Sequence, residues 1–157
     1  MILVSACLLG INCKYNGGHN RQQEVITRCL KVGCIPICPE QLGGLATPRI
    51  PAEIIGGDGN DVLDGKARVI NQDGQDVTSY FLKGAEEVKK IAQLFSVQEA
   101  ILKEHSPSCG VKNIYTGDFC GNLKPGMGVT TASLKRLGIK ISSEKDLEGR
   151  ETLFKSN

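Results

Sequence analysis

The chain has 157 residues, 40% of them hydrophobic, and a formal net charge of +2. This length fits one domain with an ordinary core. No dense basic run offers a general electrostatic grip on nucleic acid, and no apolar run approaches the roughly 20 residues that span a bilayer. Because Met1 leads directly into a strand without a charged n-region, we expect no signal peptide and a cytoplasmic location.

The first part of the chain predicts two strands and one helix. In chain order it predicts a strand over 2–7, a loop over 8–20, a helix over 21–32, a strand over 34–38 and a long irregular segment over 39–60. Asn20 is the expected N-cap of the helix, and Gly33 is expected to end it. Pro36 argues against a central place in the sheet for its strand. The irregular segment is long enough to suggest a functional loop.

The second part continues the alternation. It predicts a strand over 66–71, a helix over 78–95, a strand over 98–103, a helix over 129–137 and a strand over 139–142. In the longest helix, apolar residues recur at helical spacing from Phe81 to Phe95, so we expect these aromatic residues in the core. Strands that alternate with helices predict an α/β fold: a single Rossmann-like domain over 1–157, with a mainly parallel sheet and helices on both faces.

Cysteines follow three of the predicted strands. Cys7 and Cys38 stand where two strands end, and Cys109 lies in the loop after a third. Because ligands of α/β sheets bind at the carboxyl ends of the strands, we expect these three thiols at one rim. Sulfur ligands suit iron–sulfur clusters or zinc better than magnesium or calcium. The chain has seven cysteines, and in a reducing compartment an odd number argues against a disulfide framework.

Other residues of the same loops are candidates for binding. Arg49 can hold a planar or anionic group, although a solvated ion pair with Glu40 is the commoner fate of such charges. Gly43 and Gly44 would let the backbone approach a ligand closely. His105 is more often structural than catalytic. Of the remaining cysteines, two are expected in the core and one is ambiguous: Cys29 and Cys34, and Cys120.

Four sequence motifs together carry a resemblance to a known family. They are Cys-Leu-Leu-Gly…Cys-Lys-Tyr-Asn-Gly from residue 7, Cys-Pro-Glu-Gln-Leu-Gly-Gly-Leu-Ala-Thr-Pro-Arg from residue 38, Asp-Val-Thr from residue 76, and Ser-Pro-Ser-Cys-Gly from residue 106. In this order and spacing they resemble the thiouracil desulfidase family over nearly the whole chain. Lys14 and Asn16 depart mildly from that pattern, where Arg and Asp are expected.

The resemblance implies an enzyme that replaces the sulfur of a thiolated pyrimidine with oxygen and releases sulfide. It implies a 4Fe–4S cluster on Cys7, Cys38 and Cys109, with one iron not bound by a protein thiolate. The acidic and hydroxyl catalytic groups map onto Glu40 and Ser106, with Ser108 as a second choice. Cys13 belongs to the pattern but receives no ligand role. The implied partner is a small thiolated pyrimidine, with no stable nucleic-acid binding and no membrane.

Two other classes of protein stay open from the residues alone. A zinc-binding protein could use the same thiols, with Cys13 or Cys120 as a fourth ligand. A sulfur-carrier or redox protein without desulfidase activity would need an exposed cysteine of low pKa and no stable metal. In a variant of the enzyme hypothesis, the substrate is thiouridine inside tRNA. The small size of the chain and the absence of a basic patch disfavour this variant.

Overall fold

The computed structural model describes residues 1–148, and residues 149–157, the end of the predicted domain, lie outside the described residues. Its centre is a parallel sheet of strand order β2-β1-β5-β8. The strands are β1 (Ile2–Ser5), β2 (Cys34–Ile37), β5 (Glu99–Leu102) and β8 (Lys140–Ser143). In register, Leu3 of β1 lies between Ile35 of β2 and Ala100 of β5.

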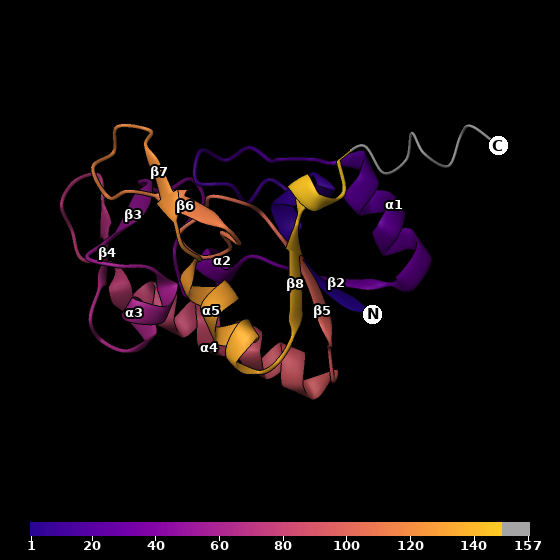
Figure 1. Cartoon of the computed structure of the whole chain (residues 1–157). Coiled ribbons are helices and arrows are strands. Elements are labelled where there is room, and N and C mark those ends of the chain that lie inside the picture. Colours follow the sequence, from indigo (N-terminus) through magenta and orange to yellow (C-terminus); the bar gives the residue numbers. More distant parts are fainter. Residues whose placement is uncertain (149–157) are drawn as a thin grey trace.

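Helices cover both faces of this sheet (Figure 1). Because successive strand residues point to opposite faces, Leu3 packs with Val88 and Leu134 on one side. Ile2 and Val4 pack with residues of α1 on the other. The helices are α1 (Gln23–Val32) on the latter face, and α4 (Thr78–Leu94) and α5 (Val129–Arg136) on the former. The predicted α/β class, with a parallel sheet between helices, is confirmed, and the Rossmann-like label stays a prediction.

Two small antiparallel hairpins extend the molecule beside the N-terminal end of α4, on the left of Figure 1. One pairs β3 (Ala52–Ile55) with β4 (Arg68–Asn71), and the other pairs β6 (Asn113–Tyr115) with β7 (Leu123–Pro125). With α3 (Gly59–Leu63) they bury a second core in which Ile54, Val69 and Ile114 surround Phe81 of α4. These hairpins lie beside the carboxyl ends of the parallel strands.

Short helices follow three of the parallel strands. The 3-10 helix η1 (Ala6–Leu9) follows β1, and α2 (Pro39–Leu42) follows β2, while a third short turn, η2 (Glu144–Asp146), follows β8. The helix α2 packs directly against α4, as the space around two glycines shows. A Cβ on Gly43 would stand 2.0 Å from the Tyr80 carbonyl oxygen. A Cβ on Gly84 would stand 2.0 Å from the Pro39 carbonyl oxygen. Two glycines therefore set how closely the helix that carries Glu40 approaches the core.

Several predictions of local structure are wrong in detail. The segment 39–60 is not irregular throughout, since it contains α2 and β3 and the start of α3, and the β6–β7 hairpin was not predicted. The N-cap of α1 is Gln22, because Asn20 instead donates its backbone N–H to the Cys7 carbonyl oxygen. Phe95 is 54% exposed, because α4 ends one residue before it. Pro36 does lie on an edge strand, as predicted.

No helix among residues 1–148 is both long and apolar enough to cross a membrane.

Candidate active site

A pocket of about 450 Å³ opens at the carboxyl ends of the parallel strands. Four of the seven cysteines line it: Cys7, Cys13, Cys38 and Cys109. Glu40, Ser106 and Ser108 line it as well. Its size is that of an ordinary small-molecule site. The structure therefore brings together the three predicted thiols and the three predicted catalytic side chains.

Each thiol reaches the pocket from a different connection. Cys7 lies in η1 directly after β1, and its carbonyl oxygen accepts from the Asn20 and Gly10 N–H groups. Cys38 directly follows β2 and is the N-cap of α2. Cys109 lies in the loop after β5 and is 4% exposed. Parallel strands thus end in thiols that face one volume.

The fourth thiol, Cys13, lies between two of the others. Its hydrogen bonds with Cys38 and Cys7 raise the pKa of Cys13 far above the ordinary range. The same contacts lower the pKa of Cys7, and they lower the pKa of Cys38 to about 6. Burial raises the pKa of Cys109. Cys7 and Cys38 therefore ionise more readily than Cys13 and Cys109.

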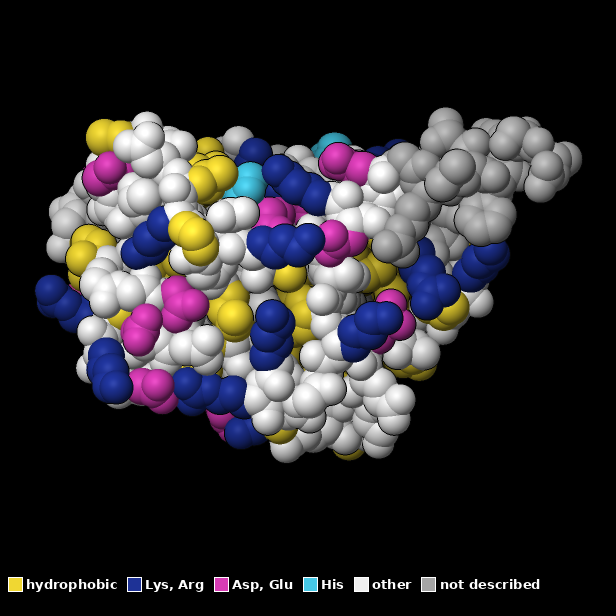
Figure 2. Space-filling model, viewed as in Figure 1, with side chains coloured by type: hydrophobic (Ala, Val, Ile, Leu, Met, Phe, Trp, Pro, Cys, Tyr) yellow, Lys and Arg dark blue, Asp and Glu magenta, His cyan; other side chains and the backbone are white. Residues whose placement is uncertain are grey.

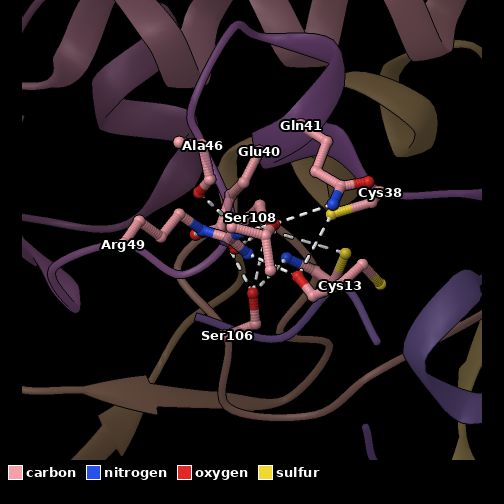
Figure 3. A network of polar contacts seen from close by, with 10 residues as sticks. Cys13, Cys38, Glu40, Gln41, Ala46, Arg49, Ser106 and Ser108 are labelled. Carbon is pink, nitrogen blue, oxygen red and sulfur yellow. Dashed lines mark hydrogen bonds and ion pairs between the residues drawn. The ribbon is translucent and has the colours of Figure 1, made fainter. Parts of the chain in front are cut away.

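Glu40 and two serines form a chain of hydrogen bonds beside the thiols (Figure 3). Ser108 Oγ donates to Glu40 Oε2 at 3.0 Å and lies 2.9 Å from Ser106 Oγ. Ser106 Oγ accepts from the backbone N–H groups of Ser108 and Cys109, both at 3.1 Å. Since the single hydroxyl hydrogen of Ser108 is used on Glu40, Ser106 must donate to Ser108. The chain therefore has one direction, from Ser106 through Ser108 to Glu40.

Arg49 holds Glu40 against the thiol loops. Its Nε donates to Glu40 Oε1 at 3.1 Å, and its Nη2 donates to the Cys13 carbonyl oxygen at 2.9 Å. The side chain is only 7% exposed, and Nη1 donates to Thr47 Oγ1 and the Ala46 carbonyl oxygen. Arg49 lines the pocket, but its donors contact protein groups. Its predicted contact with substrate stays a prediction.

The loop that carries the serines and Cys109 is folded around a buried carboxylate. Glu104 is 3% exposed, and its Oε1 accepts from the N–H groups of Val111, Lys112 and Asn113 at 2.8, 2.9 and 3.1 Å. A fourth N–H, that of His105, lies at 3.3 Å. Burial opposes ionisation, but these donors outweigh it and lower the pKa of Glu104.

Not every predicted site residue lies at the pocket. Gly43 and Gly44 are absent from its lining, and Gly43 instead lies against the Tyr80 carbonyl oxygen of α4. That these glycines bring backbone to a ligand stays a prediction. Cys29 is buried in α1, as expected, whereas Cys34 is half-buried. Cys120 is exposed in the β6–β7 connection.

The donor set fits a cluster better than a single ion. Among residues 1–148, no three His, Cys, Asp or Glu side chains stand close enough together to hold one metal ion. Cys109 nevertheless lines the same pocket as Cys7 and Cys38. Cysteine thiolates that surround one pocket without forming a single-ion group suit an iron–sulfur cluster, which is held by such thiolates. The predicted zinc alternative is therefore not favoured.

The fold and the pocket together define an α/β enzyme whose thiols, carboxylate and hydroxyls meet at the ends of parallel strands. Residues 2–146 match the model of the 2-thiouracil desulfurase family, and the chain belongs to this family. The uncharacterized protein YbbK of Bacillus subtilis is 46% identical over 147 residues, which cover 94% of this chain and 97% of YbbK. The solved 4Fe–4S-dependent thiouracil desulfidase TudS is 37% identical, with a TM-score of 0.81 over 98% of this chain and 97% of TudS. The predicted family and its desulfidase class of enzyme are confirmed.

Sequence reasoning missed other residues of the pocket. Glu53, Tyr115 and Phe119 line it from the two small hairpins. No motif marks them, and the hairpin that carries Phe119 is not among the predicted elements. The available signal for Glu53 was a glutamate among the mostly apolar residues of 52–55.

Proposed function

We propose that this protein replaces the sulfur of a thiolated pyrimidine such as 2-thiouracil with oxygen, consuming one water and releasing sulfide. The observation that carries the proposal is the meeting of Cys7, Cys38 and Cys109 with the Glu40–serine chain at one pocket. The family to which the chain belongs and its similarity to TudS support the same reaction.

The thiols of Cys7, Cys38 and Cys109 would hold a 4Fe–4S cluster and leave one iron without a protein thiolate. When bound, the cluster would supply a thiophilic Lewis acid that favours a thiocarbonyl over its oxygen analogue. The proposal gives no ligand role to Cys13, although this thiol lines the same pocket. The buried loop around Glu104 keeps Cys109 and both serines in fixed relation to one another.

Glu40 is the proposed general base. Its Oε2 already accepts a hydroxyl hydrogen, and the Arg49 guanidinium holds its other oxygen in place. A water that attacks the ring carbon must lose its protons, and Glu40 can take one directly or through Ser108 and Ser106. The departing sulfur needs a proton, which the same chain can return. The two serine hydroxyls therefore orient the water and relay its proton, while the Glu40 carboxylate holds that proton.

The charge distribution on the surface supports a small substrate, as does the size of the pocket. On the face seen in Figure 2, Lys and Arg side chains are interspersed with Asp and Glu rather than gathered in one field. Nucleic acids are bound mainly through such basic fields. This supports a free base or nucleoside as the substrate rather than a structured RNA.

The test is turnover by protein purified without oxygen. The protein is incubated with 2-thiouracil and, in parallel, with 4-thiouracil, and sulfide and uracil are both quantified. We expect equal amounts of sulfide and uracil from at least one of the two. Iron-loaded protein that forms neither product would contradict the proposal.

A further inference from the structure

Two aromatic residues of the pocket have an unusual backbone. Among residues 1–148, only three residues other than glycine have a positive φ, and two of them, His105 (φ 73°) and Phe119 (φ 57°), line the pocket. The left-handed conformation is unfavourable for residues with large side chains. Residues held in it concentrate at functional sites, where surrounding structure maintains them.

A buried carboxylate maintains each of these conformations. Glu53 is 8% exposed, and its Oε1 accepts from the N–H groups of Gly117 at 2.9 Å and Phe119 at 3.2 Å. Glu104 accepts from the His105 N–H in the same way. Both carboxylates line the pocket beside the aromatic residue that they hold. The loop around Phe119 therefore reaches the site in a preset conformation.

Three aromatic side chains line the pocket, and we name them the aromatic wall: His105, Tyr115 and Phe119. The His105 and Tyr115 rings are in edge-to-face contact, with centroids 6.0 Å apart. Tyr115 ends β6, and Phe119 lies in the connection that follows. None of the three belongs to the proposed cluster ligands or the proton chain. Their use is therefore not explained by the chemistry derived above.

We propose that the aromatic wall binds the flat face of the thiolated ring, with Phe119 as the main contact and Glu53 as its positioning residue. This rests on the proposed function and deepens it, because it names the residues that would hold the ring. Aromatic side chains stack on nucleobases of any sequence, and their removal weakens binding by roughly 5- to 100-fold. The aromatic wall would fix the plane of the ring, while the thiols and the Glu40–serine chain of the same pocket would act on its sulfur.

The test separates ring binding from chemistry. Phe119→Ala and Phe119→Leu are compared with Phe119→Tyr, which keeps an aromatic face, and with Leu123→Ala, an exposed change in the same hairpin outside the pocket. KM and kcat for 2-thiouracil are measured on cluster-loaded protein. The Kd for 2-thiouracil is measured by calorimetry with every variant placed in the Glu40→Gln background, where turnover is expected to be about 100-fold slower.

We expect Phe119→Ala to raise KM and Kd by roughly 5- to 100-fold, with kcat and iron content nearly unchanged. The KM and Kd of Phe119→Leu should lie between those of Phe119→Ala and the wild type. Those of Phe119→Tyr and Leu123→Ala should match the wild type. Glu53→Ala should reproduce the rise in KM, and Glu53→Gln, which keeps an acceptor, should restore most of the affinity.

An unchanged Kd in Phe119→Ala would overturn the inference, as would a fall in kcat at constant KM. These results differ from failure of the proposed function. If the wild type binds 2-thiouracil through Phe119 but releases no sulfide, the function fails and the aromatic wall stands. If sulfide is released equally well without Phe119, the function stands and the wall fails.

Discussion

Replacement of Glu104 by alanine should destabilise the loop that carries Ser106, Ser108 and Cys109. The Glu104 carboxylate accepts three backbone N–H groups within 3.1 Å, and it is 3% exposed. A hydrogen bond to a charged group contributes about 1.5–3 kcal/mol. Because the three donors share one oxygen and their energies do not add, we expect a loss of about 3–5 kcal/mol, the range seen when one partner of a buried charged contact is removed.

The matched variant is Glu104→Gln, which keeps an acceptor oxygen and removes the charge. Neutral hydrogen bonds have about half the strength of charged ones, so the expected loss is about 1–2 kcal/mol. Urea unfolding measures both differences, provided that the m-value is unchanged. A Glu104→Ala protein within about 1 kcal/mol of the wild type would refute the reasoning, since buried donors left without an acceptor cannot be so inexpensive.

Acid provides an independent check on the same residue. The folded protein lowers the pKa of Glu104 below its ordinary value of 4.5. The carboxylate therefore stabilises the fold fully above that value, and its contribution is lost as the pH falls through the lower, folded pKa. The advantage of the wild type over Glu104→Gln should shrink below pH 4.5. An advantage that grows with acid would have the wrong sign.

Three further changes test separate parts of the site. Glu40→Gln should lower kcat by about 100-fold or more, the range of general-base catalysis, while the iron content stays that of the wild type; iron loss would instead make Glu40 part of the cluster site. Cys13→Ala should retain the iron, measured by colorimetric assay of anaerobic protein, whereas Cys38→Ala should lose it; equal loss in both would make Cys13 a ligand. Gly43→Ala should cost about 1–3 kcal/mol in urea unfolding, because the new Cβ would meet the Tyr80 carbonyl oxygen; an unchanged midpoint would show that α2 is free to move.

Much of the site was predictable because its residues follow regular strands. Cys7 and Cys38 directly follow short apolar runs, and a parallel sheet places such residues at one edge. Cys109, Glu40 and the serines were marked by their motifs. The fold class followed from the alternation of elements, and Pro36 correctly indicated an edge strand.

The rest depended on contacts that are distant in sequence. Gly43 looked like a ligand-binding glycine, but its neighbour is α4, nearly forty residues later, and no local pattern reveals that approach. Glu53 and Phe119 meet across 66 positions. The strands β3, β6 and β7 have only three or four residues each, too few to show an alternating pattern, and they are formed by pairing and by the core around Phe81.

The central claim is that three thiols hold one cluster and leave one iron open to the substrate. Mössbauer spectroscopy of iron-57-labelled, anaerobically purified protein tests it most directly. We predict about four irons per chain with one site distinct from the other three, and a change confined to that site when 2-thiouracil is added. Four equivalent irons that do not respond to 2-thiouracil, or stoichiometric zinc in place of iron, would contradict the account.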